Sequence, residues 1–538
     1  MTDLIIHQAR LRTMTDPSGS SLSPLTALAV VEGTITRVGT DEEILALRSA
    51  DTEVIDAQGM TLTPGLIDSH AHPVLGAEAT MGADLGGLTD VAAVREALAR
   101  AAADLPADAW VRGWNLDYKV FSEEELHGRL FEEAVGGRPM LLIFFDMHTG
   151  LANTAALERV AIDGSESFDD GSEIVLDDQG VPTGELREIP AYLKLLDAAP
   201  AGSGGDIAAR VQDQLLTMAA SGVTRSTVMD GRLPTLRTLE LAESLPGGLP
   251  VELHVALWHQ PGDDDDVVQE RIAFLGTGGQ RYRVSMIKMF IDGVIDAGTA
   301  WLHAPDAHGD STEPFWHSLG RFAEVAGRYH RAGFQLTTHS CGDAGVAHVA
   351  GVYRDLGEEL SPHAPFRIEH LETLTDADIR ALVDARIVAS MQPLHMQWRE
   401  ADDSDPWAER LGAERAARAW RIRDILAAGG RVALGSDWPV ASGDARYGMA
   451  WTRLRREPGS AEAPEFQPDQ RLTAGETLLG YTRWAAEALG RADLGVIEEG
   501  TVADLALWSG DPVDVTADEL PDLPVELTVL GGKIAYRR

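Results

Sequence analysis

The sequence has a single cysteine, Cys341, among 538 residues. No disulfide can therefore form within the chain, and this favours a cytoplasmic protein. The first residues, Met1 to His7, lack the basic and apolar segments of a signal peptide, and no apolar run approaches the roughly 18 residues of a membrane span. We expect a cytoplasmic protein that has no membrane partner.

Positive charge is also scarce. The chain has 85 acidic and 45 basic residues, which gives a formal net charge of −40, and only four of the basic residues are lysine. This surplus of negative charge argues against nucleic acid or an anionic membrane as a partner. We therefore expect a small-molecule partner. The same features are also compatible with a homodimer. With 44% hydrophobic residues, the chain can bury more than one ordinary domain core.

Two histidines one residue apart follow an apolar segment near the N-terminus. Gly65 to Ile67 leads into His70 and His72, and Pro73 ends the run. Alternate side chains of a β-strand point to the same side, so the two imidazoles share a face. Together they form half of a zinc-type site. Taken alone, the pair also fits two solvated loop histidines.

Lys288 lies within a second apolar run, Val284 to Ile291, which is typical of a buried strand. Burial of an ammonium group is unfavourable, so the pKa of this amine should fall toward neutrality. A neutral lysine can act as a nucleophile, form a Schiff base, or capture carbon dioxide as a carbamate that bridges metal ions. The alternative is a lysine that reaches water from a half-exposed strand.

Three further apolar strands end in a residue that can bind a metal. These residues are His339, His370 and Asp437. Each alone fits a packed core histidine or a helix-capping aspartate. Five strand ends that all present His, Lys or Asp are difficult to explain by chance, and they favour a metal centre.

Eight apolar runs alternate with helical stretches, which indicates an α/β fold built as a TIM-like (β/α)8 barrel. Active sites of such barrels lie at the C-terminal ends of the strands, so the candidate ligands on strands 1, 4, 5, 6 and 8 would converge on one mouth. The predicted strands are residues 66–70, 223–228, 251–257, 284–291, 334–338, 366–370, 387–391 and 432–436, and the predicted helices include 205–220, 319–332, 376–384 and 413–428.

The rest of the chain predicts two further regions. Residues 1–62 and 498–538 contain short β-type runs broken by turn residues, and we expect them to form one small β-sandwich from both termini. The barrel then comprises residues 63–73 and 205–497. Residues 74–204 form an insertion after barrel strand 1, and long insertions at this place are commonly lids or substrate-binding elements.

Several motifs together resemble the amidohydrolase superfamily of metal-dependent hydrolases, over nearly the whole chain. They most resemble family 3, in the branch that includes N-substituted formamide deformylases. The motifs are TPGLIDSHAH at 63–72, WNLD at 114–117, PTGELRE at 182–188 and GSDWPV at 435–440. The resemblance implies a hydrolase that cleaves a non-peptide carbon–nitrogen bond in a small amide, formamide or cyclic amide.

The resemblance also implies roles for the six candidate ligands. His70, His72 and Asp437 would bind one divalent metal, expected to be zinc, and His339 and His370 would bind a second if two ions are held. Lys288, carboxylated to a carbamate, would bridge them. A hydroxide held by the metals would be the nucleophile, with Asp437 as the catalytic acid and base.

Substrate contacts are expected from the insertion and from the loop after strand 7. The candidates are Trp114, Asp146, His148, Arg187, Gln392 and His395, with Asn153 nearby; the alternative for those in the insertion is a loop network of hydrogen bonds. Twelve tryptophans favour an apolar or aromatic substrate group. Two segments depart from the branch's usual pattern, namely Ser340-Cys341 and the loop from Asp292 to Asp296. For Cys341, packing is favoured over metal binding.

Two other functions are compatible with the same residues. A metal-assisted lyase or isomerase could use Asp437 to move a proton without net hydrolysis. A non-catalytic binding protein could retain the barrel, although the presence of all six ligand-type residues argues against it.

Overall fold

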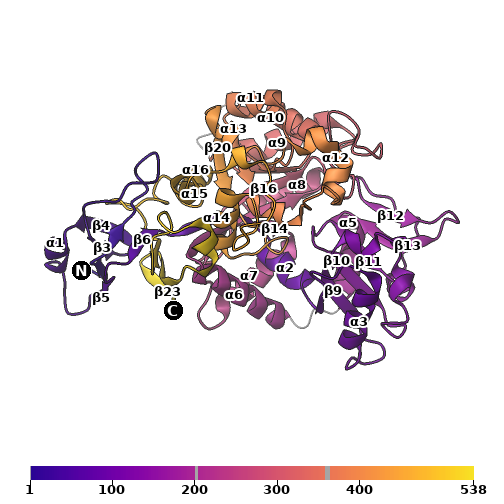
Figure 1. Ribbon diagram of the computed structural model, residues 1–538, viewed down its shortest axis with the longest axis horizontal. Coiled ribbons are helices and arrows are strands. Elements are labelled where there is room, and N and C mark those ends of the chain that lie inside the picture. The colour runs from indigo at the N-terminus through magenta and orange to yellow at the C-terminus, as the bar shows by residue number, and fades with distance from the viewer. Residues whose placement is uncertain (1, 200–203, 358–363) are drawn as a thin grey trace.

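The computed structural model describes residues 2–199, 204–357 and 364–538. Figure 1 shows three groups of elements: strands from both termini at one end, a barrel in the middle, and a second sheet at the other end. Within the described ranges, no helix has both the length and the apolar character needed to cross a membrane.

The central element is a sheet of eight parallel strands, in which each strand pairs with the next in chain order. The first and last strands are joined by a bridge between Ala71 and Trp438, so the barrel is nearly closed. These strands are buried on both faces, which explains their nearly continuous apolar sequences. The predicted (β/α)8 barrel is confirmed. Its strands are β7 (Leu66–Ala71), β14 (Val223–Gly231), β15 (Glu252–His259), β16 (Tyr282–Phe290), β17 (Gln335–Ser340), β18 (Arg367–His370), β19 (Val388–Met391) and β20 (Arg431–Leu434).

Helices follow most of the barrel strands. Local signals fix their ends: in the helix from Leu319 to Ala332, Ser318 caps the first turn, and Gly333 ends it in a left-handed conformation with φ of 105°. The helices of this region are α2 (Pro73–Ala79), α6 (Gly204–Ala220), α7 (Leu233–Ser244), α8 (Asp265–Ala273), α9 (Leu319–Ala332), α10 (Asp343–Gly357), α11 (Asp376–Asp384), α12 (Pro406–Ala416), α13 (Ile422–Ala427), α14 (Ala445–Leu454), α15 (Ala474–Gly480) and α16 (Arg483–Ala488), with short 3-10 helices η3 (Pro393–Trp398) and η4 (Pro468–Gln470).

One predicted helix is wrong. Residues 413–428 form the end of α12 and the separate helix α13 rather than one helix. Between them, Ala419 forms a bridge with Thr373, and Trp420 adopts a left-handed conformation with φ of 42°. The amide of Trp420 donates to the carbonyl of Glu372 at 2.9 Å, so a tertiary contact replaces the helical hydrogen bond.

The strands from the two termini form two facing sheets. Apolar side chains from both sheets, among them Ile6, Leu28, Leu62, Leu505 and Val529, form one common core, as expected for a sandwich. The first sheet contains β1 (Leu4–His7), β3 (Ala27–Val31), β4 (Thr34–Gly39) and β5 (Glu53–Asp56), with helix α1 (Asp41–Leu45) beside it; the second contains β2 (Arg10–Leu11), β6 (Thr61–Pro64), β21 (Leu505–Trp508), β22 (Val525–Leu530) and β23 (Lys533–Arg537), with 3-10 helix η5 (Ala517–Asp522) between β21 and β22.

The segment between β7 and α6 contains a six-stranded sheet with its own apolar core. The predicted division into residues 1–62 with 498–538, 63–73 with 205–497, and 74–204 stays a prediction, and residues 200–203 at one junction lie outside the described residues. The elements of this segment are β8 (Ala83–Asp84), α3 (Val91–Ala102), β9 (Val111–Leu116), η1 (Tyr118–Phe121), η2 (Gly128–Phe131), β10 (Met140–Phe144), β11 (Thr149–Ala152), α4 (Thr154–Val160), β12 (Glu173–Leu176), β13 (Pro182–Arg187) and α5 (Ile189–Ala198).

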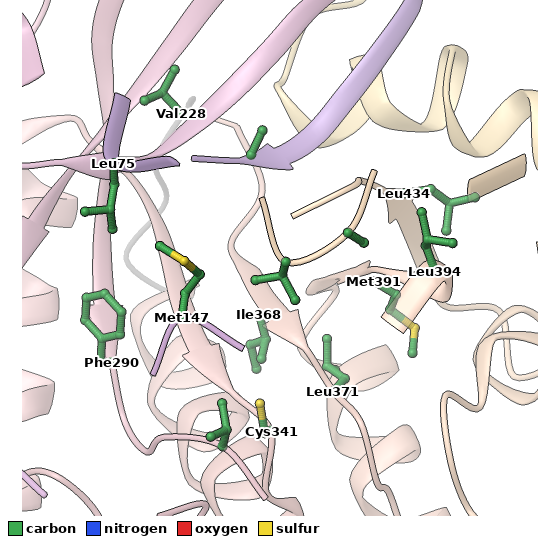
Figure 2. Packing of buried hydrophobic residues seen from close by; sticks show 14 of the residues in the cluster. Leu75, Met147, Val228, Phe290, Cys341, Ile368, Leu371, Met391, Leu394 and Leu434 are labelled. Carbon is green, nitrogen blue, oxygen red and sulfur yellow. The ribbon is translucent and has the colours of Figure 1, made fainter. Parts of the chain in front are cut away.

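This inserted sheet contacts the barrel loops directly. The ring of Phe145 stacks on Trp398 with a centroid distance of 4.1 Å, and Lys119 forms an ion pair with Glu400 at 2.9 Å. The insertion also shares the main apolar core: Figure 2 shows Met147 packed in the same cluster as Ile368 and Leu434 of the barrel strands. The insertion is therefore held over the C-terminal ends of the strands.

Candidate metal centre

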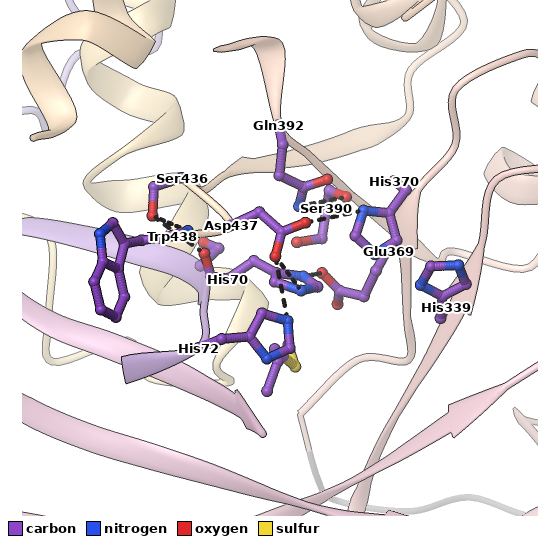
Figure 3. A network of polar contacts seen from close by, with 12 residues as sticks. His70, His72, His339, Glu369, His370, Ser390, Gln392, Ser436, Asp437 and Trp438 are labelled. Atoms are coloured by element: carbon purple, nitrogen blue, oxygen red, sulfur yellow. Dashed lines mark hydrogen bonds and ion pairs between the residues drawn. The ribbon is translucent and has the colours of Figure 1, made fainter. Parts of the chain in front are cut away.

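The six predicted ligands lie at the C-terminal ends of the barrel strands. His70 and His339 are in β7 and β17, His370 ends β18, and Lys288 is near the end of β16. His72 and Asp437 lie just past the ends of β7 and β20. Five of the six, His72, Lys288, His339, His370 and Asp437, line a single cavity, and the donor atoms of His70, His370 and Asp437 lie within 4.8 Å of one another. Figure 3 shows His70, His72 and His370 grouped around the carboxylate of Asp437.

The carboxylate of Asp437 is the centre of this cluster. Its Oδ1 atom lies 3.2 Å from Nε2 of His72 and 3.4 Å from Nε2 of His70, and its Oδ2 atom lies 3.6 Å from Nδ1 of His370. Burial alone would raise the pKa of Asp437, but its neighbours, the hydrogen-bonding imidazole of His72 among them, lower it well below its ordinary value. Asp437 is therefore an ionised carboxylate surrounded by nitrogen donors.

The hydrogen bonding of His70 tests whether a cation fits here. Burial lowers the pKa of His70 to about 4, so the ring is neutral. Its Nδ1 lies 2.7 Å from a carboxylate oxygen of Glu369, and this contact requires the ring proton to be on Nδ1. The lone pair of Nε2 then faces Oδ1 of Asp437, and Nε2 has no hydrogen-bond partner. Two facing lone pairs repel, and a cation between them removes the repulsion, so the donor set fits a metal ion.

Glu369 is a further candidate residue of this centre that the sequence analysis did not single out. It is fully buried and accepts hydrogen bonds from the Arg367 guanidinium and the Thr337 hydroxyl in addition to His70. Burial would raise the pKa of Glu369, but Arg367 and His70 lower it well below its ordinary value. A carboxylate that fixes the tautomer of a metal-binding histidine is a common feature of metal sites. The signal in the sequence was the pair of charged residues, Arg367 and Glu369, inside a buried strand.

Lys288 is buried, with 1% of its surface exposed, and its Nζ lies 5.5 Å from the centroid of the Phe290 ring. Burial lowers the pKa of Lys288 to about 8, although the nearby carboxylates of Glu369 and Asp437 oppose this shift. At this pKa, roughly a tenth of the amine is uncharged at pH 7. The uncharged amine is the form that can react with carbon dioxide.

The ends of the ligand strands have an unusual backbone. His370 and Asp437 have φ values of 77° and 59°, in the left-handed region that residues other than glycine rarely adopt. Such conformations require support from the surrounding structure and are concentrated at functional sites. Here, the amide of Asp437 donates to the carbonyl of His70 at 2.7 Å, so the last barrel strand is tied to the first at the ligands.

The two segments that depart from the family pattern contact each other beside His339. The carboxylate of Asp292 accepts hydrogen bonds from the backbone amides of Cys341 and Gly342 at 3.2 and 2.9 Å. Nε2 of His339 lies 3.1 Å from the carbonyl of Gly293 and 3.6 Å from Sγ of Cys341. Asp292 therefore holds the loop after β16 against the loop after β17.

Three of the predicted substrate-binding residues lie beside the candidate metal centre. Asp146, His148 and His395 line a pocket that also reaches His339, His370 and Asp437. Nδ1 of His148 lies 2.6 Å from the carboxylate of Glu188, and although burial acts against the charged ring, this carboxylate raises the pKa of His148 to about 9. His148 is therefore an imidazolium at neutral pH. Nε2 of His395 lies 3.4 Å from Oδ2 of Asp437.

The other predicted substrate-binding residues are not brought to this pocket. Trp114 lies in β9 of the inserted sheet, and Arg187 forms ion pairs with Glu185 and Glu173 beside a different cavity. Gln392 is fully buried, and its amide donates to the carbonyl of Ser390 at 3.3 Å. Asn153 caps helix α4 and bonds to the backbone of Met140 and Arg138, so it has a structural role inside the insertion.

Aromatic side chains form much of the pocket wall. Phe145 of the insertion and Trp398 of the barrel stack on each other, and Trp407 stacks on Trp420 with a centroid distance of 5.0 Å. Trp407 and Trp420 come from α12 and from the irregular segment after it, where the predicted helix is interrupted. The abundance of tryptophan in the sequence predicted an apolar or aromatic substrate group, but it did not indicate which tryptophans form this wall.

Comparisons with known proteins show the family and agree with the barrel fold. The sequence profile of a family described as the amidohydrolase family matches residues 53–536. The chain is 30% identical to the N-substituted formamide deformylase of Arthrobacter pascens, over 100% of this chain and 99% of the relative. It is 26% identical to YtcJ of Bacillus subtilis, over 95% and 96% of the two chains. The fold is similar to that of a metal-dependent hydrolase from Pyrococcus horikoshii, with a TM-score of 0.73 at 21% identity, covering 96% of this chain and 99% of that chain.

Proposed function

Because this chain belongs to the amidohydrolase family, we propose that it hydrolyses a non-peptide carbon–nitrogen bond in a small amide, formamide or cyclic amide at a centre that binds one or two divalent metal ions. One observation carries the proposal: His72, Lys288, His339, His370 and Asp437, from five different strand ends, line a single cavity. Imidazole and carboxylate donors suit zinc, which we take as the first metal to test.

In this proposal, His70, His72 and Asp437 hold one ion. His339 and His370 would hold a second ion, and Lys288, as a carbamate, would supply an anionic ligand to the pair. A divalent ion bound there would lower the pKa of a water molecule and polarise the substrate carbonyl. Glu369 keeps Nε2 of His70 free for the metal, because it occupies the other ring nitrogen.

Asp437 is the proposed acid and base. Its lowered pKa keeps it ionised and able to accept a proton from the attacking water. Once protonated, the same carboxyl group can act as an acid and pass that proton to the nitrogen of the leaving amine. His148, which Glu188 keeps protonated, lines the same pocket and can donate a hydrogen bond to the oxygen that gains negative charge.

We further propose that residues 74–204 form the substrate-binding cover of the barrel. Phe145, Asp146 and His148 come from this segment and line the pocket together with the metal ligands. The substrate would therefore bind between the two parts, which is a common place for a small-molecule site.

The test begins with metal content and a screen of N-substituted formamides and other small amides, using the zinc-loaded enzyme. We expect turnover that is lost after chelation and restored by zinc, with oxygen from labelled water in the acyl product. Product formed without solvent oxygen would favour a lyase or isomerase instead. Absence of both bound metal and turnover would refute the proposal. The variant Asp310→Asn serves as a control, because Asp310 is exposed and lies outside the pocket.

A further inference from the structure

Resting on the proposed function, we propose that the substrate carries a cationic nitrogen, such as a primary ammonium group, bound by the carboxylate of Asp296 and by the aromatic rings of the pocket. The inference concerns the part of the substrate that does not react. It is based on an acid without a partner, on the charges around that acid, and on the aromatic wall.

Asp296 lies in the loop that follows β16 and lines the pocket above the candidate metal centre. Its carboxylate receives a hydrogen bond from its own backbone amide, and no other described residue donates a hydrogen bond to it or forms an ion pair with it. Burial, followed by the negative charges of Glu372 and Asp146, raises the pKa of Asp296 well above its ordinary value. A cation that enters the pocket would therefore stabilise the ionised form of this carboxyl group.

The rest of the pocket also carries a surplus of acids. Apart from the candidate ligand Asp437, the carboxylates of Asp146, Asp296 and Glu372 all line it. Asp146 accepts from the hydroxyl of Tyr118 at 2.7 Å and is near the imidazole of His148, while Glu372 accepts from the indole of Trp407 at 2.7 Å and lies 3.8 Å from Nδ1 of His395. Among the described residues, Asp296 forms no such contact.

The two cationic side chains of the pocket are already paired with other acids. His148 is bound to Glu188 at 2.6 Å. Nε of Arg399 lies 3.0 Å from Asp405, and its Nη2 bonds to Asp403. Neither cation therefore neutralises Asp296, and a positively charged substrate group would do so.

The aromatic wall favours the same kind of group. The stacked pairs Phe145 with Trp398 and Trp407 with Trp420 both line the pocket. Aromatic faces attract cations, and the attraction is larger where water is excluded. A neutral apolar group would also gain from contact with these rings, but it would leave the carboxylate of Asp296 without a partner. A cation satisfies both features.

The experiment compares three N-substituted formamides that share an arylmethyl group and differ in the substituent at the far end of the ring: aminomethyl, methyl or carboxyl. Hydrolysis by the full-length, zinc-loaded enzyme is followed for each. We expect kcat/KM for the aminomethyl compound to exceed that for the methyl compound by about tenfold to hundredfold, the range of a charge-assisted hydrogen bond, with the difference mainly in KM.

The variant Asp296→Asn should remove this preference, mainly by raising KM for the aminomethyl compound to the value for the methyl compound. Asp310→Asn, in the same loop, removes the same charge but should keep the preference, because Asp310 is exposed and paired with Arg410. Metal content is measured in every variant. If Asp296 instead balances the charge of the metal, Asp296→Asn will lose metal and hydrolyse all three compounds more slowly, and the inference is refuted.

Two further results would overturn the inference. Equal kcat/KM values for the aminomethyl and methyl compounds would refute it while leaving the proposed hydrolysis intact. Preference for the carboxyl compound would point instead to Nη1 of Arg399, which is buried without a hydrogen-bond partner. If none of the compounds is hydrolysed, the proposed function fails separately, and calorimetric binding of the same three compounds still decides whether the pocket prefers a cation.

Discussion

Replacement of Glu369 by glutamine tests whether this carboxylate supports the candidate metal centre. The substitution keeps the size of the side chain but removes its charge. Glu369 is fully buried and contacts two groups of different function: His70, a proposed ligand, and Arg367, a buried cation. The change should therefore affect both metal binding and stability.

The two effects can be estimated separately. Loss of one partner of a buried ion pair typically destabilises a protein by about 3–5 kcal/mol. We expect a value near the lower limit, about 3 kcal/mol, because Arg367 also donates to the carbonyl of Ser69 and the hydroxyl of Ser390. Loss of the carboxylate behind His70 should weaken zinc binding by about 10- to 100-fold, the usual effect of such outer-shell changes.

Unfolding in urea gives the first quantity, and competition with a chromophoric zinc chelator gives the second. Asp504→Asn is the matched control: Asp504 forms a buried pair with Arg225 near the opposite, N-terminal ends of the strands. It should lose stability to a similar extent but bind zinc normally. Unchanged zinc affinity in Glu369→Gln would refute the proposed orientation of His70.

Three further predictions concern other parts of the structure. Lys288→Ala should lose most bound metal and activity, with partial rescue by bicarbonate and a short carboxylic acid; near-normal metal content in an elemental analysis would exclude the carbamate bridge. Asp437→Asn should lower kcat by roughly 10²- to 10⁴-fold while one metal is retained at reduced affinity, and an unchanged rate would require another base. Arg423 lowers the pKa of Glu476 to about 2 through two contacts of 2.7 Å. A depressed folded-state pKa stabilises the protein above the unfolded pKa of about 4.5, and this stability is lost as the pH falls toward 2. Urea midpoints of Glu476→Gln should therefore depend less on pH in this window than those of the parent protein, and equal slopes would refute the assignment.

Much of the barrel could be predicted because its signals are local. The apolar run that ends at His339 and the helix from Leu319 to Ala332 are both visible in short segments, since strand and helix periodicities depend on neighbouring residues. The break at Trp420 could not be predicted in this way. It depends on a hydrogen bond to Glu372, a residue that is distant in the sequence.

The same distinction applies to the candidate site. Residue types at strand ends were sufficient to propose His70, Lys288 and Asp437, because a parallel barrel brings all such ends together. The sequence did not reveal the contact between His70 and Glu369, which are 299 residues apart, or the pair of His148 with Glu188. It also placed Trp114 and Arg187 among the substrate contacts, whereas neither residue lines the pocket, and Arg187 lines a different cavity.

The sequence by itself determined the order of the barrel strands, the six candidate metal ligands and the excess of negative charge. These follow from composition and from periodicity within short segments. The tertiary structure alone decided which carboxylates are paired, which nitrogen of His70 is free, and which acid, Asp296, faces the pocket without a partner. Charge pairing depends on distances across the fold, and residues far apart in the chain set those distances.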